Sequence, residues 1–304
     1  MKRQSLKLVV VAVLVSLAAS GLGSLGHGSP LSPTMEPADK AAAPHVVFVT
    51  GDDEYRSEIT MPMLARILEE RHGFKCTVCR AVNPTTGQGE PKFKRNIAGL
   101  EALANADLAV FYLRFRELPP EQLERILEFV RSGKPTVGLR TTTHAFLYPA
   151  DNPQSRWNDG FGIEVFGQKW LRHHGHDSST QVSLAVRDHP ICRGVPPEWH
   201  CRSWLYHVTP LVGDCSSIAL GAAVKGTKSD GQRFGTANPV AWTKTHQGGR
   251  VFFTTLGHPS DFEHEATRRL VLQGIFWSLG READIPEAGL AAEPLEPFVA
   301  PPTW

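Results

Sequence analysis

The sequence predicts an α/β protein built on a doubly wound, mostly parallel sheet that carries a His/Trp-rich insertion. Short continuous apolar runs, typical of strands buried on both faces, alternate with segments whose apolar residues have helical spacing. Such alternation favours parallel strands joined by right-handed helical crossovers, with helices on both faces of the sheet. From residue 141 to about residue 239 the alternation stops, and His, Trp, Gly and Pro become frequent. This change indicates an elaboration of the same fold.

The first half of the chain supplies the regular alternation. Apolar runs predict strands at 45–50, 74–79, 107–113 and 135–139. The helices between them are expected at 60–72, 100–104 and 119–133. Gly73 is suited to cap the first helix, and proline opens the last one in the position that suits it.

The second half returns to the sheet only near its end. The insertion predicts a few short strands, such as 180–186 and 217–224. A hairpin then pairs 239–243 with 250–255 around Gln247-Gly248-Gly249. The last helix, 263–279, has an apolar face that needs a sheet to pack on. We therefore expect one sheet to contain both the early strands and the hairpin.

The two ends of the chain differ from the predicted fold. A basic start, an apolar run over 8–19 and small residues after it follow the order of a secretory signal. We expect 1–26 to be a signal peptide, 27–44 a flexible leader, and the protein to be periplasmic or secreted. The apolar run is shorter than the roughly 20 residues of a membrane span, so a membrane is a partner only if the signal is uncleaved. Residues 282–304 predict a Pro-rich tail, which leaves 45–281 as one domain.

Composition and motifs exclude several classes of function. A formal net charge of +1 predicts no nucleic-acid partner. No GxGxxG motif follows the first strand, so no nucleotide cofactor is expected. Five cysteines leave at least one thiol unpaired, and neither the disulfide pairing nor the oligomeric state follows from the pattern. Cys76 and Cys79 have CxxC spacing, but residues three apart on a strand point to opposite faces, so we expect buried structural thiols.

Polar residues follow the predicted strands at their carboxyl ends, the edge where open α/β sheets bind ligands. The residues expected to act in catalysis are Glu54, Arg114, His144 and His258. Those expected to bind substrate are Asp53, Tyr55, Arg56, Trp170 and His173. We expect one imidazole to be a general base with a pKa near neutrality. Each residue also has an ordinary interpretation, because a strand-end Asp often caps a helix and Arg56 has Glu58 nearby as a partner.

The densest polar cluster is the insertion segment 172–177, Arg-His-His-Gly-His-Asp. Imidazoles this close are candidate ligands for zinc or another divalent metal. Because adjacent residues rarely bind one ion together, the expected ligands are His174 with His144 and His258. The alternative is a loop that contacts sugar or phosphate through hydrogen bonds. No complete metal-binding motif is present.

The turn after the fourth strand lacks a GxSxG or GxCxG nucleophile motif. It reads Gly138-Leu139-Arg140-Thr141-Thr142-Thr143-His144, so a Thr hydroxyl beside His144 is the only nucleophile it offers.

Four segments of the chain resemble the ThuA-like (trehalose utilisation) family. They are 49–56, 138–146, the Asp-His-Pro-Ile stretch 188–194, and 250–258 with Arg268-Arg269-Leu270 after it.

The resemblance covers about residues 45–281. It implies a flavodoxin-like, class I glutamine amidotransferase-like fold whose elbow cysteine is gone. It also implies a role in the use of trehalose or a related disaccharide through keto-sugar intermediates. The function expected from it is a sugar or keto-sugar hydrolase, isomerase or lyase that works by acid/base chemistry without glutaminase activity. Trp157, Trp170 and Trp204 are candidates to stack on the sugar.

Two other functions fit the same residues. The first is a non-catalytic carbohydrate-binding or scaffold protein. The second is a metal-dependent hydrolase of another substrate, which requires the His-rich loop to hold zinc.

Overall fold

A computed structural model describes residues 42–303, and its central feature is one ten-stranded sheet with the order β3-β2-β1-β4-β5-β12-β11-β10-β7-β8. The parallel half consists of β2 (Lys75–Ala81), β1 (His45–Gly51), β4 (Leu108–Leu113), β5 (Thr136–Leu139) and β12 (Gly249–Thr254). The antiparallel strands are β3 (Ile97–Ala98), β11 (Arg233–His246), β10 (Ser216–Lys225), β7 (Ser178–Leu184) and β8 (Glu198–Cys201). The predicted α/β fold class is confirmed, and the insertion extends the sheet with antiparallel strands.

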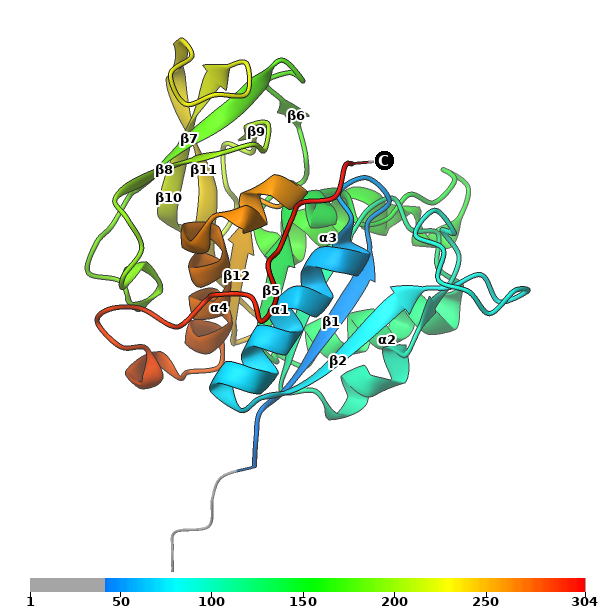
Figure 1. Ribbon diagram of the computed structural model, residues 1–304. Helices are drawn as coiled ribbons and strands as arrows, with labels where there is room; N and C mark the ends of the chain where they lie inside the picture. Colours follow the sequence, from blue (N-terminus) through cyan, green and yellow to red (C-terminus); the bar gives the residue numbers. More distant parts are fainter. Residues whose placement is uncertain (1–41, 304) are drawn as a thin grey trace, which may run out of the picture. The chain divides into compact units, whose positions relative to one another are not determined.

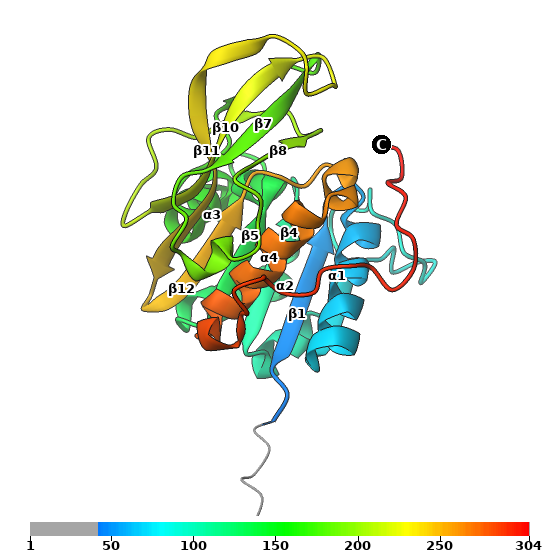
Figure 2. The same cartoon turned by 60° about the vertical axis from the view of Figure 1, so that its left-hand side comes forward.

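Helices cover both faces of the parallel half (Figures 1 and 2). One face carries α1 (Ser57–His72) and α4 (Glu265–Ser278), and the other carries α2 (Pro120–Arg131) and α3 (Trp157–Phe166). Alternate residues of β1 serve the two cores: Val46 and Phe48 pack with the first pair of helices, and Val47 with the second. Burial on both faces explains why the strand has an unbroken apolar sequence.

Short elements connect this framework. The 3₁₀ helices are η1 (Leu100–Asn105), η2 (Arg140–His144), η3 (Pro153–Arg156), η4 (Pro190–Cys192), η5 (Pro259–Glu263) and η6 (Glu282–Asp284). A separate two-stranded sheet pairs β6 (Arg172–His173) with β9 (Tyr206–His207). In both views β7, β10 and β11 rise beyond the carboxyl ends of the parallel strands (Figures 1 and 2). The insertion therefore overhangs the edge where the site is expected.

Helix α3 lies in the region that predicted only short strands. Gly160 and Gly162 interrupt its sequence, and glycine in a helix interior lowers helix propensity by about 1 kcal/mol relative to Ala. Gly162 is required by packing, because a Cβ there would overlap the carbonyl oxygen of Thr143. The close contact between α3 and η2 thus requires Gly162, and the low helix propensity of glycine is the reason that the sequence did not predict this helix.

The predicted tail lies along α1 and α4 and ends beside the carboxyl edge (Figure 1). Leu290 and Ala292 are buried in the core on this face. Arg71 Nε donates to the carbonyl oxygen of Glu293 at 2.8 Å, and Arg268 Nε donates to that of Ala292 at 2.6 Å. The packed core therefore continues past residue 281.

The predicted signal peptide, 1–26, lies outside the described residues, as does most of the leader. Within residues 42–303, none of the helices is long and apolar enough to cross a membrane.

Candidate functional site

The turn after β1 is organised by Asp52, which is wholly buried. Its carboxylate accepts hydrogen bonds from the backbone N–H groups of Glu54 at 3.2 Å and Tyr55 at 2.6 Å. Burial raises the pKa of Asp52 to about 7, although the hydrogen bond from Tyr55 opposes this rise. Asp52 therefore shapes the loop that presents Asp53, Glu54 and Tyr55 at the end of the strand.

The structure brings Asp53, Glu54 and Arg114 into one charge cluster. Arg114 Nη1 lies 3.2 Å from Asp53 Oδ1, and its Nε lies 2.8 Å from Glu54 Oε2. Lys94 and Arg116 also pair with Asp53. Burial alone would raise the pKa of Asp53, but Lys94 and the two guanidinium groups outweigh it and hold the pKa below its ordinary value. Asp53 is therefore charged and fully engaged by cations, which makes it a weak proton acceptor.

Arg56 lies next to this cluster and directly precedes α1. Its Nε pairs with Glu58 Oε1 at 2.6 Å, and its Nη1 donates to the carbonyl oxygen of Pro302 at 3.3 Å. Arg56 therefore forms the ion pair with Glu58 that the sequence offered as the alternative to a role in substrate binding.

A group of aromatic rings surrounds the guanidinium of Arg140, the first residue after β5. The Cζ atom lies 4.2 Å from the ring centroid of Tyr55, 4.6 Å from that of Tyr206 and 5.6 Å from that of Trp204. Nη2 donates to the Tyr55 hydroxyl at 3.1 Å, and Nη1 donates to the carbonyl oxygen of Thr255 at 2.9 Å. We call Arg140 with these three rings the Arg140 cluster.

His144 joins this cluster through Tyr206, at 6.2 Å between ring centroids, and also lies 5.4 Å from Trp170. Its Nδ1 is 3.2 Å from the hydroxyl oxygen of Thr143. Burial, helped by the charges of Arg114 and Arg140, lowers the pKa of His144 to about 3. The imidazole is therefore neutral at neutral pH and a much weaker base than an exposed histidine.

His258 joins the same cluster through Tyr55, 6.1 Å away, and Trp204, 6.3 Å away. Its Nδ1 accepts a hydrogen bond from the backbone N–H of Ser260 at 3.2 Å, so the neutral ring carries its proton on Nε2. Burial lowers the pKa of His258 to about 4, against the opposing charge of Asp261. His258 is therefore a hydrogen-bond donor at Nε2, and neither imidazole has the near-neutral pKa expected of a general base.

The insertion brings His173 and His176 to the Arg140 cluster but turns His174 away. His173 lies 5.8 Å from Trp204 and 4.8 Å from His176. His174 instead packs against Phe234, at 4.4 Å, and against His207. His173 ends β6 and His174 directly follows it, and the two rings lie in different surroundings.

The metal site expected at His174, His144 and His258 is not assembled. No group of three or more His, Cys, Asp or Glu side chains within residues 42–303 is arranged to hold a metal ion. The donors present therefore do not fit a zinc site of the predicted composition.

The family model for ThuA, described as trehalose utilisation, matches residues 45–278. The chain belongs to the ThuA family. Among solved structures it is similar to a ThuA-like protein from Bacteroides uniformis, with 14% identity, 80% of this chain and 95% of that chain covered, and a TM-score of 0.55. It is also similar to a ThuA-like protein from Parabacteroides merdae, with 18% identity, 78% and 90% coverage, and a TM-score of 0.50. Identities this low support the fold alone. A search of curated proteins found no match.

In this ThuA-family protein the residue after β5, where a nucleophile elbow would place its nucleophile, is Arg140, with a positive φ of 41°. The three threonines that follow are wholly buried. Thr142 donates to the carbonyl oxygen of Phe111 at 2.8 Å, and the Thr143 hydroxyl is shared between a backbone carbonyl and His144. All five cysteines are free, and none lies in this turn. The elbow thus presents no accessible nucleophile.

The Cys76 and Cys79 thiols lie in β2, away from the elbow. Burial raises the pKa of Cys79 to about 12 and also raises that of Cys76. Both thiols therefore stay protonated, as expected of structural cysteines.

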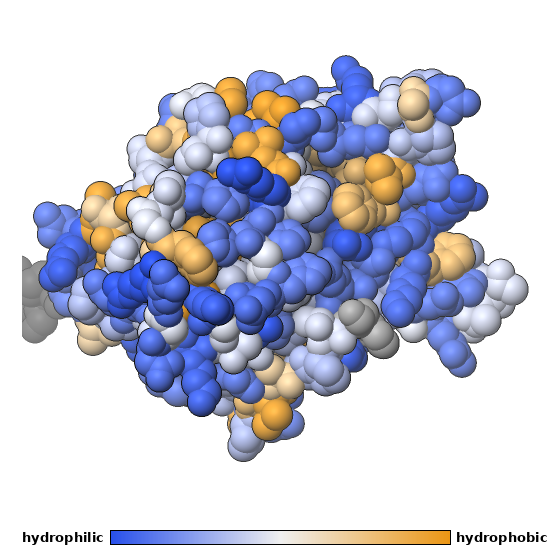
Figure 3. All heavy atoms as spheres, turned by 90° about the horizontal axis from the view of Figure 1, so that it is seen from above, coloured by the Kyte–Doolittle hydropathy of each residue, from blue (hydrophilic) through white to orange (hydrophobic). Residues whose placement is uncertain are grey.

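One cavity lies at the carboxyl edge, beside the turn that follows β1. It has a volume of about 140 Å³ and is lined by Thr50, Gly51, Asp52, Ser57, Glu58, Arg80, Ala81, Gly89 and Pro91. The surface on this side is largely hydrophilic with separate apolar patches (Figure 3). None of the residues predicted for the site lines the cavity itself.

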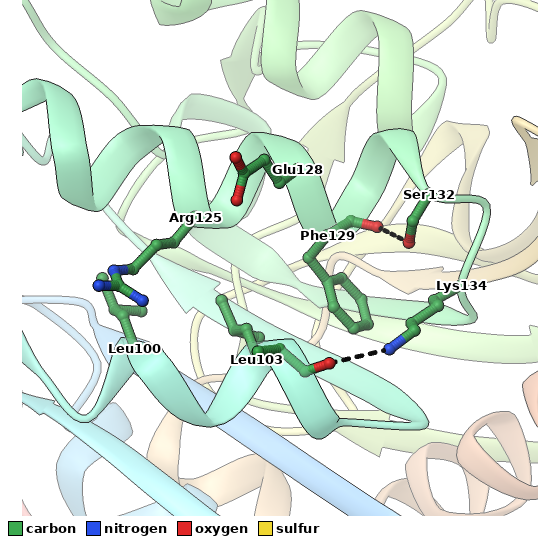
Figure 4. Close-up of a pocket in the computed structure, with 8 residues that line it drawn as sticks. Leu100, Leu103, Arg125, Glu128, Phe129, Ser132 and Lys134 are labelled. Carbon is green, nitrogen blue, oxygen red and sulfur yellow. Dashed lines mark hydrogen bonds between the residues drawn. The ribbon is translucent and has the colours of Figure 1, made fainter.

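A second cavity, of about 200 Å³, lies at the opposite edge of the sheet between η1 and α2 (Figure 4). Leu100, Leu103 and Phe129 form its apolar part, and Lys134 Nζ donates to the carbonyl oxygen of Ala106 at 2.8 Å. It lies far from the strand ends that bind ligands in open α/β sheets, so we do not assign it to the reaction.

Sequence reasoning missed the central role of Arg140 and the contribution of Tyr206. Arg140 was identified as a polar residue at the end of the fourth strand and in the elbow turn but was given no role, and Tyr206 had no motif around it. Trp204 and Trp170 were candidates and do lie here. Trp157 packs elsewhere, with the guanidinium of Arg156 4.5 Å from its ring centroid.

Proposed function

We propose that this protein acts on trehalose, a related disaccharide or its keto-sugar derivative at the carboxyl edge of the sheet. The observation that carries the proposal is the Arg140 cluster together with the imidazoles around it. Aromatic faces pack against the apolar faces of sugar rings, and hydrogen-bond donors between them select hydroxyl or carbonyl oxygens. Trp204 and Trp170 are half-buried and supply such faces.

The chemistry that suits these groups is proton transfer next to a carbonyl, which needs a base and a stabiliser of the resulting oxyanion. Glu54 is the proposed base. Arg114 contacts its Oε2, and no hydrogen-bond partner of Oε1 occurs among the described residues. The Nε2–H of His258 and the guanidinium of Arg114 are the proposed donors to the oxyanion. His144 serves as a neutral imidazole that orients the substrate.

The same site is proposed to lack glutaminase activity. Hydrolysis of glutamine in this fold class requires a nucleophile at the elbow, and Arg140 occupies that position here. The neighbouring Thr hydroxyls are buried and already hydrogen-bonded.

The low pKa values of His144 and His258 favour a second candidate function, carbohydrate binding without turnover. Neutral imidazoles make good hydrogen-bonding partners for sugar hydroxyls even when they are weak bases. A metal-dependent hydrolase is not favoured, because the donor side chains do not converge within residues 42–303.

A screen of unoxidised and oxidised disaccharides separates these functions. Binding is followed by calorimetry and turnover by NMR of the sugar. The proposed enzyme consumes a keto-disaccharide, and E54Q lowers its kcat by about 100-fold or more. E117Q is the matched control, since Glu117 pairs with Arg95 at the surface at 2.9 Å and lies outside the site.

Binding without turnover by the wild type supports the second candidate. If no sugar is bound or consumed by the wild type, both candidates are refuted.

A further inference from the structure

We propose that Arg140 is a positioning residue whose guanidinium holds the rings of Tyr55, Tyr206 and Trp204 in place as one wall of the candidate site. Its consequence for sugar binding rests on the proposed function, whereas the positioning itself does not depend on the substrate. Arg140 has a φ of 41°, in the left-handed region that non-glycine residues rarely adopt. Such conformations persist where the surrounding structure determines them.

The loop that carries His258 packs directly on this strained turn. Gly257 has a φ of 151°, and a Cβ there would lie 2.7 Å from the Tyr112 hydroxyl and 3.1 Å from Arg140 Cβ. The Tyr112 hydroxyl also donates to the carbonyl oxygen of Gly257 at 2.7 Å. The absence of a side chain at Gly257 thus lets the His258 loop approach Arg140 closely.

The side chain of Arg140 is a buried charge without a carboxylate partner. It is wholly buried, and no Asp or Glu lies within ion-pair distance of it among residues 42–303. A buried cation is strongly disfavoured unless other groups compensate its charge. Here the compensation comes from the oxygens of Thr255 and Tyr55, from the electron-rich faces of three rings, and from the charge of the buried Asp261 beyond ion-pair distance. Because the cation depends on these rings, the rings are held around it.

Each ring in turn contacts an imidazole of the site. Tyr55 lies 6.1 Å from His258, Tyr206 lies 6.2 Å from His144, and Trp204 lies 5.8 Å from His173. One side chain therefore sets the positions of groups that come from four distant parts of the sequence.

Arg140 also orients the Tyr55 hydroxyl. The hydroxyl oxygen accepts a hydrogen bond from Nη2 at 3.1 Å, and no acceptor for its own hydrogen occurs among the described residues. The O–H of Tyr55 is then directed away from Arg140, within a side chain that is buried. Lysine cannot replace this arrangement, because a single ammonium lacks the planar fork that reaches two oxygens while stacking on rings.

The test compares R140M and R140K with the wild type and with the control R268M. Arg268 is also a buried arginine that donates to two backbone carbonyls, of Ala292 and Phe262, but no aromatic ring of the described residues stacks on it. Far-UV circular dichroism selects conditions in which each variant is folded. The readouts are the near-UV circular dichroism of Tyr and Trp and the ring-shifted NMR resonance of His258, assigned with H258N.

We expect R140M and R140K to change the near-UV signal and to lose the ring-current shift of His258, while R268M keeps both. The conservative R140K carries the test if R140M does not fold. A folded R140K or R140M with unchanged aromatic signals overturns the proposal, and so does an equal loss in R268M.

A titration with trehalose then separates this inference from the proposed function. If the wild type binds trehalose, we expect R140K to raise the Kd for trehalose by at least about tenfold. If the wild type binds no sugar but the aromatic signals still depend on Arg140, the proposed function fails and the positioning role stands. Unchanged sugar affinity in R140K overturns the predicted consequence for binding.

Discussion

The loop that carries His258 depends on Asp261, and replacing this residue is the most direct test of how the site is held. Asp261 is wholly buried. Its Oδ1 accepts from the backbone N–H of Ser203 at 3.0 Å. Its Oδ2 accepts from the backbone N–H groups of Gly257 at 2.9 Å and His258 at 3.1 Å, and from the Ser203 hydroxyl. One carboxylate therefore joins the insertion to the loop after β12.

The two simplest substitutions at Asp261 should differ in magnitude. Hydrogen bonds to a charged group contribute about 1.5–3 kcal/mol each, and the losses are not additive. In D261N the amide can turn so that its oxygen keeps the three donors of Oδ2, which leaves one backbone N–H of Ser203 unpaired. We expect a loss of about 2–3 kcal/mol in the free energy of unfolding. D261A removes all four bonds and leaves buried donors unpaired, so we expect about 4–5 kcal/mol, near the upper limit for single substitutions.

Urea unfolding followed by far-UV circular dichroism measures both values near neutral pH. D159N is the control, because the Asp159 side chain is 62% exposed and pairs with Lys169 at the surface. Its expected effect is below about 1 kcal/mol. A loss of less than about 1.5 kcal/mol in D261A, or equal losses in D261N and D261A, would contradict the assignment of these hydrogen bonds.

Three further predictions follow from burial, packing and the terminal sequence. The folded pKa values of His144, about 3, and His258, about 4, lie below the ordinary value of 6.5, so the unfolded state binds more protons and the free energy of unfolding falls as pH drops from about 6.5 toward 4. H144Q and H258Q should each flatten this fall in urea unfolding across a pH series, and an unchanged slope would argue against the shifts. G162A should lower the free energy of unfolding by about 2 kcal/mol or more because of its overlap with a backbone carbonyl. G160A, whose Cβ would lie 3.5 Å from its nearest neighbour, should be neutral or slightly stabilising in the same thermal or urea assay, and equal effects would refute the packing account. Mass spectrometry of protein from its native host should find a mature N-terminus after about residue 20 in the extracytoplasmic fraction, and a soluble cytoplasmic pool that retains Met1 would oppose export.

The strands of the parallel half were predictable because they are buried on both faces. Runs such as 45–50 and 107–113 are apolar without a break, and in a chain of alternating elements this pattern is typical of a buried parallel strand. The grouping of Asp53, Glu54 and Arg114 at one edge follows from the same topology, because parallel strands place their carboxyl ends together.

Other features had no local signal. Helix α3 was not predicted because its contact with η2 requires Gly162, and glycine weakens the helical signal of the sequence. His173 and His174 are neighbours in the sequence, yet β6 ends at His173 and the chain places the two rings in different surroundings. His174, His144 and His258 are of a residue type that binds zinc, but the backbone of the described residues does not bring them together.

The sequence by itself determined the fold class, because the spacing of apolar residues reflects which faces of each strand and helix are buried. It also predicted that Asp53, Glu54 and Arg114 lie together at the carboxyl edge of the sheet. Only the tertiary structure decided what those side chains can do. The protonation of His144 and His258 depends on burial and on the charge of Arg140, and the environment of Arg140 comes from Tyr55, Trp204 and Tyr206, which lie far from it in the chain. Desolvation and ring contacts of this kind arise only when distant segments pack together, so no local pattern in the sequence records them.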